Sequence, residues 1–487
     1  MALSPRRLAV LLTAFGVLAV LAALRLPPIQ DETYYWAWSR QLEWSYLDHP
    51  PAIAAILAAS TALFGDGPLG LRAASLLAIG VVLALSASSA RRLAGGRSSA
   101  GYLAILVLLG APMFVVGYVP GTHDPIQGAA AALGAYAVIR ALEPGAARRW
   151  SFLAGFVLTA AVLIKHSSAL LAAGALLGAA GTARGRVLLA RPAPWLGAAL
   201  GALVLAPWLA SELTANGGSI RFQAQHVFAS RPSRGVVAVP LTLGSMILTL
   251  GPLTAIAILI APLSALSARI DAAASALGAG ALLLLAACLV AVWSGSGEAN
   301  WPMPALVFVL PALAAEVVDR PRVLPALATQ ATLTAVIGLV LLLHAAFDLL
   351  PLPSLKDPLQ RGAGFDRVAA RAEAQAEHHG ARLVVTRRYQ IASLLRYHLR
   401  DRWPVLELGS PRGRPSQYDR WGRPAICPGE VVVVVSPDPS PPAELSLVPL
   451  EEPVPVERSQ GAERWWVRAF RATAAFGSSC GIAEVRS

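Results

Sequence analysis

Long apolar segments alternate with short polar connections over the first 350 residues of the chain. The first apolar segment runs from Leu8 to Leu24, directly after Pro5-Arg6-Arg7. At a rise of about 1.5 Å per residue, it is long enough to cross the hydrocarbon core of a membrane. Similar segments follow at roughly 71–90, 100–118, 125–142, 150–164, 167–183, 193–211, 237–262, 272–293, 302–317 and 323–346. This pattern predicts an α-helical polytopic membrane protein with about eleven transmembrane helices.

Arginine marks every second connection between these segments. The arginines are Arg91-Arg92 with Arg97, Arg148-Arg149, Arg184 with Arg186 and Arg191, Arg269, and Arg320 with Arg322. Basic residues favour the cytoplasmic side, so we expect these connections and the N-terminus inside. A cleaved signal peptide is the competing interpretation of the first segment, but the apolar run is long for one. The other connections then share the outer face, where their acidic, histidine and aromatic residues converge: 31–66, 121–124, 165–166, 212–234 and 294–301.

The composition changes after Leu350, where the chain becomes charged and rich in proline. Its pattern predicts helices over Phe365–His379 and Tyr389–Leu399. It predicts strands at Arg382–Thr386, Val405–Leu408, Glu430–Ser436 and Trp465–Phe470. Strands alternating with helices favour a small α/β domain over residues 351–487, after a transmembrane domain over residues 1–350 with a first outer loop at 27–70. An odd number of spans would place the α/β domain outside the cytoplasm.

The overall composition agrees with a membrane protein, because 56% of the residues are hydrophobic and only 14% are charged. The formal net charge of +12 would suggest a nucleic-acid partner in a soluble protein. Here the arginines lie mostly in short connections, where membrane topology accounts for them, so we expect no nucleic-acid partner. Arginine nearly replaces lysine, and the only lysines are Lys165 and Lys356.

Cysteine usage and short motifs bound the chemistry. Cys288 lies within a predicted span, whereas Cys427 and Cys480 belong to the tail. These two either form a disulfide in an oxidising compartment or stay buried thiols. The sequence has no CxxC, HExxH, P-loop or GxGxxG context. We therefore expect no cofactor, and a divalent metal ion stays open.

Two carboxylates open the first outer loop. Asp31 and Glu32 begin a segment rich in tyrosine and tryptophan, residues that favour the membrane interface. Asp31 follows Pro27-Pro28, so one interpretation is a helix N-cap. The other is a general base that accepts a proton from a substrate hydroxyl, in surroundings desolvated by aromatic rings. Glu32 would point about 100° away on a helix, so the two carboxylates need not do the same job.

Polar residues at other outer span ends also have two interpretations each. Asp48-His49 and Asp124 precede prolines, which suits turns and helix starts as well as a substrate site. Lys165 lies between two apolar runs and either snorkels to the interface or meets an anion.

The connections 212–234 and 294–301 add three more candidates. Arg221 and Arg231 have aromatic neighbours and would grip a phosphate or rest on anionic headgroups. Glu298 precedes Pro302, where helix initiation is the plain alternative.

Several motifs occur in one order along the chain. They are an Asp-Glu pair with Tyr and Trp, YxDHPP (Tyr46–Pro51), LFGDGPLGLR (Leu63–Arg72), Asp124 before proline, Lys165, FQxxH (Phe222–His226), EANWP (Glu298–Pro302), and in the tail RYQIASLLRYHL and RPSQYDRW. Together they resemble bacterial integral-membrane glycosyltransferases of the GT-C class, family 39. That group includes protein O-mannosyltransferases and ArnT-like transferases of aminoarabinose and galacturonic acid. The resemblance covers nearly the whole chain.

The resemblance implies transfer of a sugar from a polyprenyl-phosphate carrier to an acceptor, on the outer side of a bacterial inner membrane. It implies that Asp31 activates the acceptor hydroxyl, with inversion at the sugar, and that His226 and Arg231 lie near the carrier phosphate. Where ArnT-like members have a lysine before the two prolines, this chain has His49, a weaker phosphate partner. The cation that holds the phosphate is therefore open among Lys165, Arg72, Arg221 and Arg231. The expected substrate-binding residues are Glu32, His49, Arg72, Asp124, Lys165, Arg221, His226, Arg231 and Glu298.

A transporter or flippase for lipid-linked sugars is the alternative function. Such a protein is expected to have repeats, broken helices and charges near the bilayer midplane. No clear inverted repeat is visible, and the polar residues cluster at outer span ends, which favours an enzyme. The acceptor stays open among lipid A, another lipid, a protein and a polysaccharide.

Overall fold

The computed structural model describes residues 5–214, 218–228, 237–267, 271–350, 352, 357–409, 414–458 and 464–477. The chain forms two compact units. One holds the residues up to Arg25 together with Leu42–Leu349, and the other holds Leu26–Gln41 together with the residues from Leu350 onward. We describe each unit by itself.

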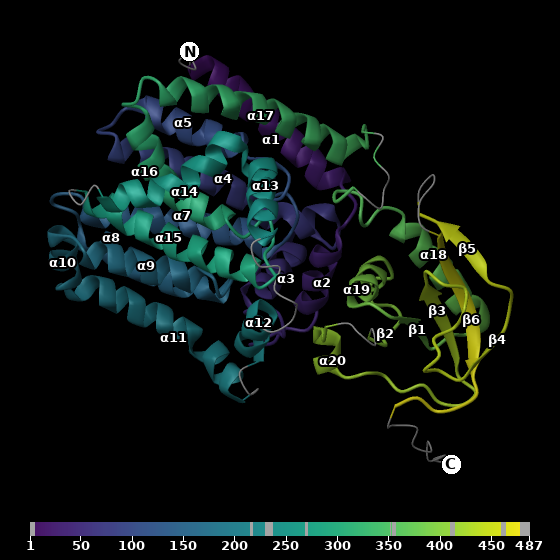
Figure 1. Ribbon diagram of the computed structural model, residues 1–487. Coiled ribbons are helices and arrows are strands. Elements are labelled where there is room, and N and C mark those ends of the chain that lie inside the picture. Colours follow the sequence, from purple (N-terminus) through teal and green to yellow (C-terminus); the bar gives the residue numbers. More distant parts are fainter. Residues whose placement is uncertain are drawn as a thin grey trace. The chain divides into compact units, whose positions relative to one another are not determined.

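The first unit is a bundle of helices (Figure 1). Its elements are α1 (Pro5–Arg25), α3 (Ala52–Phe64), α4 (Pro68–Leu93), α5 (Ser98–Leu109), α6 (Pro112–Val115), α7 (His123–Leu142), α8 (Arg148–Ala160), η1 (Ala161–Leu163), α9 (Ser168–Ala180), α10 (Ala183–Leu189), α11 (Pro192–Thr214), α12 (Gly218–Phe228), α13 (Ala238–Leu250), α14 (Pro252–Ser267), α15 (Ala272–Trp293), α16 (Met303–Val317) and α17 (Val323–Phe347). Each apolar segment that the sequence predicts as a span corresponds to one or two of these helices. The prediction of an α-helical polytopic fold is therefore confirmed.

Six helices in the described part of the chain are long and apolar enough to cross a membrane. A seventh span is counted if α13 and α14, which meet at a bend of 110°, form one broken span. The bend falls at Gly251, whose φ of 86° suits glycine. The Gln330 side chain of α17 stabilises it, because Oε1 accepts a hydrogen bond from the Thr254 backbone N–H at 3.1 Å. A Cβ at Gly251 would lie 2.4 Å from Gln330 Nε2, so a larger residue does not fit.

Small residues let neighbouring helices approach closely. A Cβ built at Gly197 of α11 would lie 1.9 Å from the carbonyl oxygen of Phe152 on α8. A Cβ at Gly178 of α9 would lie 2.3 Å from the carbonyl oxygen of Ser275 on α15. Close backbone contact of this kind replaces the hydrophobic effect as the source of packing inside a membrane.

The second unit contains a six-stranded sheet in the order β2-β1-β3-β6-β4, with β5 also pairing to β6. Its elements are α18 (Phe365–His379), β1 (Leu383–Thr386), α19 (Tyr389–His398), β2 (Val405–Glu407), α20 (Gln417–Trp421), β3 (Val431–Ser436), β4 (Leu447–Pro449), β5 (Val454–Glu457) and β6 (Arg464–Ala472). Strand β1 runs parallel to β2 and β3, and β6 is antiparallel to β3, β4 and β5. The predicted small α/β domain is confirmed. The short elements β4, β5 and α20 were not predicted, because each lacks a sustained apolar period.

Helix α2 (Gln30–Ser39) belongs to this second unit, although it lies between the first two long apolar segments in sequence. The Tyr34 hydroxyl accepts a hydrogen bond from the Gln417 backbone N–H at 2.6 Å. The Tyr34 ring centroid lies 4.6 Å from that of Tyr389, and Trp36 meets Tyr397 edge-on at 5.3 Å. A ten-residue helix is marginal by itself in water, so this aromatic packing is what stabilises α2. The domain boundary expected from the sequence instead placed these residues in the transmembrane domain, as part of the loop 27–70.

Candidate functional site

A buried carboxylate lies at the start of α7 and is held from three directions. The Lys165 ammonium donates to Asp124 Oδ1 over 2.8 Å, and the Asn300 side-chain amide donates to Oδ2 over 2.5 Å. His123 Nε2 lies 3.2 Å from Oδ1. The side chains of Lys165 and Asp124 are each only 12% exposed. A buried ion pair is expensive unless further hydrogen bonds support it, and here Asn300 and His123 provide additional contacts to the Asp124 oxygens.

Local structure explains why these side chains meet. Thr122 is the N-cap of α7, so Asp124 is the second residue of the helix and points its carboxylate toward Lys165 instead of capping. Lys165 follows η1, at the break between α8 and α9. Asn300 lies just before α16. One cluster therefore forms from the start of α7, the break after η1 and the loop before α16, and Lys165 meets an anion of the protein instead of snorkelling to the interface.

Two histidine rings lie beside this cluster. The ring centroids of His49 and His123 are 4.3 Å apart. The pKa of the His49 imidazole lies well below its usual value, mainly because the ring is buried and also because His123 and Lys165 are close to it. His49 is therefore a neutral hydrogen-bonding group at neutral pH. It does not replace the lysine cation that ArnT-like sequences carry before the two prolines.

A second buried carboxylate, Glu212 at the end of α11, links the segment before α3 to the start of α12. It accepts hydrogen bonds from the Ser45 hydroxyl, from the Ser219 hydroxyl at 2.8 Å, and from the backbone N–H groups of Ser219 and Ile220 at 3.2 and 3.0 Å. The last two groups belong to the first turn of α12, so Glu212 caps that helix from outside. Sequence analysis missed Glu212, since a glutamate at the end of an apolar run carries no motif.

Helix α12 is also tied to the YxDHPP segment. The side-chain amide of Gln223 donates to the Asp48 carbonyl oxygen at 2.6 Å. Arg221 lies exposed on the same helix, and His226 is part of it, although the His226 side chain is outside the described residues. Arg231 lies wholly outside the described residues.

The two carboxylates of α2 have different surroundings. The N-cap of α2 is Ile29, and its backbone N–H donates to Glu32 Oε2 at 3.0 Å. Glu32 is fully buried, whereas Asp31 is exposed on the first turn. The capping role that the sequence suggested for Asp31 therefore belongs to Glu32, while Asp31 is exposed.

Three further residues can be placed. Arg72 is fully buried, and its Nη1 donates to the Ala23 carbonyl oxygen at 2.8 Å, so the guanidinium ties α4 to α1. Glu298 is exposed in the loop before α16. Cys427 is disulfide-bonded, while Cys480 lies outside the described residues.

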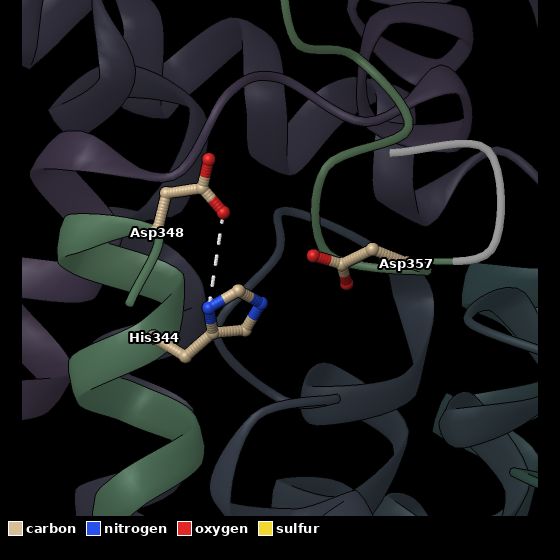
Figure 2. Close-up of side chains that lie close together, drawn as sticks. All are labelled: His344, Asp348 and Asp357. Carbon is tan, nitrogen blue, oxygen red and sulfur yellow. Dashed lines mark ion pairs between the residues drawn. The ribbon is translucent and has the colours of Figure 1, made fainter. Parts of the chain in front are cut away.

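Figure 2 shows a histidine and an aspartate at the C-terminal end of α17. His344 Nδ1 lies 3.8 Å from Asp348 Oδ1. Asp348 ends the helix in the left-handed conformation, with φ of 51°. The contact ties this unusual backbone position to the last turn of α17.

The chain is similar to known membrane glycosyltransferases in sequence family and in fold. Residues 48–210 match the family model of dolichyl-phosphate-mannose-protein mannosyltransferases. No curated protein sequence matches the chain. The crystal structure of ArnT from Cupriavidus metallidurans bound to undecaprenyl phosphate is similar over 95% of this chain and 96% of that chain, at 19% identity and a TM-score of 0.66.

The chain has the GT-C fold. The apo structure of the same ArnT is also similar, over 95% of this chain and 96% of that chain, at 18% identity and a TM-score of 0.61. The predicted resemblance to GT-C membrane glycosyltransferases is confirmed, and so is the prediction of a multi-pass membrane protein with this fold. The matched segment contains His49, Asp124 and Lys165.

Proposed function

We propose that the chain transfers a sugar from a polyprenyl-phosphate carrier to an acceptor, with inversion at the anomeric carbon. The observation that carries this proposal is the Lys165–Asp124 pair, a fixed ammonium among the outer helix ends of a GT-C fold. The similar ArnT structure is described as bound to undecaprenyl phosphate, which supports a carrier of that chemical class.

Lys165 is the residue that we assign to the carrier phosphate. An ammonium has three N–H donors, and Asp124 takes one of them, which leaves two for phosphate oxygens. Because Asp124 holds the ammonium and is itself held by Asn300, the ammonium stabilises the charge on the leaving phosphate without reorganising. The neutral His49 serves as a hydrogen-bonding neighbour. Arg72 is a weaker candidate than Lys165 for binding the carrier phosphate, because its guanidinium is fully buried and donates to the Ala23 carbonyl oxygen.

Asp31 is the general base of the proposed reaction. Its exposed carboxylate accepts the proton of the acceptor hydroxyl as that oxygen attacks the anomeric carbon, and the carrier phosphate leaves from the opposite face. General-base assistance of this kind contributes roughly 10²–10⁴-fold. Arg221, His226, Arg231 and Glu298 remain proposed substrate contacts. The proposed location is a bacterial inner membrane, with the N-terminus cytoplasmic and the α/β unit periplasmic.

Transfer in reconstituted vesicles tests the proposal. Vesicles containing the protein receive the polyprenyl-phosphate-sugar fraction and the envelope lipids of the source organism, and glycosylated products are measured by mass spectrometry. We expect product with the wild type, loss of product with Asp31→Asn, and normal product with Asp66→Asn, the same change in the turn between α3 and α4. Movement of the lipid-linked sugar across the bilayer without any product would instead identify a flippase.

A further inference from the structure

The hydrogen bonds around Glu212 determine the position of a proton on His166. The contact between the Ser219 hydroxyl and Glu212 Oε1 is 2.8 Å, and that between Ser219 Oγ and His166 Nε2 is 3.0 Å. Glu212 receives donors only: two hydroxyls and two backbone N–H groups. This pattern is that of an ionised carboxylate, which accepts and never donates.

Ser219 has a single hydroxyl proton, and the contact with Glu212 uses it. The Ser219 oxygen must therefore accept in its contact with His166, so His166 Nε2 carries the hydrogen. Burial lowers the pKa of His166 to about 4, so the ring is neutral at neutral pH. A neutral imidazole with hydrogen on Nε2 has a bare lone pair on Nδ1. Among the described residues, Ser219 is the only hydrogen-bond partner of the ring.

His166 lies at the same helix break as Lys165 of the cluster. His166 directly follows Lys165 in the break between η1 and α9 and is half-buried. The Trp208 ring of α11 lies 5.6 Å away, centroid to centroid, with the two ring planes tilted by 58°. Ser219 fixes Nε2, so the ring does not turn freely.

We propose that His166 is a substrate-contacting residue whose Nδ1 accepts a hydrogen bond from a hydroxyl of the bound sugar or of the acceptor. The assignment rests on the proposed transferase function, because it needs a hydroxylated substrate beside Lys165. This contact would contribute to substrate specificity. Because Nδ1 only accepts, the substrate must place a hydrogen-bond donor at this position, and a group that only accepts is rejected.

Two substitutions distinguish the roles of the two ring nitrogens of His166. His166→Gln places an amide near the position of Nε2, so the contact with Ser219 is kept while the Nδ1 acceptor is lost. His166→Asn places an amide near the position of Nδ1, so an acceptor is kept while the contact with Ser219 is lost. A purely structural histidine would tolerate glutamine better than asparagine. The proposal predicts the opposite order.

The experiment measures initial rates of sugar transfer in vesicles, with the polyprenyl-phosphate-sugar extract and the envelope lipids each varied in turn. We expect His166→Gln to lower kcat/KM about tenfold, the scale of one lost hydrogen bond to substrate, and His166→Asn to stay within about threefold of wild type. A raised KM for the donor extract assigns the contact to the sugar, and a raised KM for the lipids assigns it to the acceptor. His378→Gln, an exposed site on α18, is the matched control. A glutamine variant as active as the asparagine variant, or more so, overturns the proposal.

A second measurement does not depend on activity. ¹⁵N-histidine-labelled protein in nanodiscs reports which nitrogen of His166 carries hydrogen, with the signal assigned by its loss in His166→Gln. We expect hydrogen on Nε2, and hydrogen on Nδ1 overturns the proposal even if both variants fold poorly. Absence of any transfer by the wild type would contradict the transferase function itself, whereas normal transfer with an unaffected His166→Gln contradicts only the role of His166.

Discussion

Asp31 and Glu32 are adjacent in α2, yet one is exposed and the other is fully buried against its own helix start. Glu32 Oε2 accepts the Ile29 backbone N–H, so it stabilises the first turn. We predict that Asp31→Asn lowers transfer roughly 10²–10⁴-fold and leaves thermal unfolding unchanged. Product formation and the melting temperature of the same preparation check this. Normal turnover of Asp31→Asn would refute its role as the base.

Glu32→Ala is predicted to lower stability, in contrast to Asp31→Asn. Loss of the cap should destabilise the α/β unit by about 0.5–2 kcal/mol, which is the usual range for a capping side chain. Chemical unfolding followed by tryptophan fluorescence measures this, and Glu457→Ala, on exposed β5, provides the control. Equal stability of the Glu32→Ala variant and wild type would contradict the capping role.

The Tyr34–Gln417 contact is predicted to hold α2 on its unit. Tyr34→Phe keeps the ring but leaves the Gln417 N–H without its acceptor, in surroundings where both residues are buried. The expected cost is about 1–3 kcal/mol. Tyr136→Phe removes a comparable contact, that with Arg140 on α7, and is the matched control. Protease sensitivity within residues 26–41 should rise in Tyr34→Phe alone, and an unchanged cleavage pattern would contradict the prediction.

A pH dependence of stability is predicted from Glu407 on β2. The residue is 5% exposed, and its Oε2 has no hydrogen-bond partner among the described residues. Burial, with Asp419 nearby, raises the pKa of Glu407 to about 7 from an ordinary value of 4.5. The folded state therefore keeps a proton that the unfolded state releases between these two values. The free energy of unfolding should fall as pH rises through this window, by at most about 3 kcal/mol, and stay level above it.

Glu407→Gln tests this origin of the pH dependence. A neutral amide cannot titrate, so the slope between pH 4.5 and about 7 should flatten in the variant. Glu377→Gln, at an exposed position of α18, should keep the slope. If the slope persists in Glu407→Gln, groups other than Glu407 cause the pH dependence of stability.

The sequence predicted the parts of the fold that depend on local pattern. Apolar runs located the helices of the first unit, and helical period with a closing glycine located α18 to the residue. It did not predict that α2 belongs with the C-terminal residues, because the partners Tyr34 and Gln417 are far apart in the chain. Hydrophobic periodicity along a short segment does not indicate a contact between residues so distant in sequence.

The candidate site shows the same division. Lys165 and Asp124 were expected at one face because span ends alternate across a membrane, and the structure brings them together. The contact of Asn300 with Asp124 and the contacts of Glu212 with Ser45 and Ser219 were not predicted. Glu212 lies at a helix end without a motif, and the EANWP motif around Asn300 does not indicate which residue its amide contacts. The partners of both residues come from distant segments. Such polar contacts follow from packing in three dimensions, which a linear pattern does not encode.

The buried charge pair offers the most direct test of the proposed transfer. Removing Asp124 alone would leave a buried ammonium unpaired and destabilise the protein by about 3–5 kcal/mol, so a single variant confuses folding with function. The double variant Lys165→Gln/Asp124→Asn removes both charges, keeps the side chains close in size, and should fold. The exposed pair Arg97–Asp319 provides the matched control, Arg97→Gln/Asp319→Asn.

The decisive measurement is the rate of sugar transfer from the polyprenyl-phosphate-sugar extract in vesicles that contain either double variant. We predict that the Lys165/Asp124 variant folds normally and loses at least about 100-fold in rate, since the preset cation for the leaving phosphate is gone. The Arg97/Asp319 variant should match the wild type. Wild-type rates in a folded Lys165→Gln/Asp124→Asn protein would contradict the account.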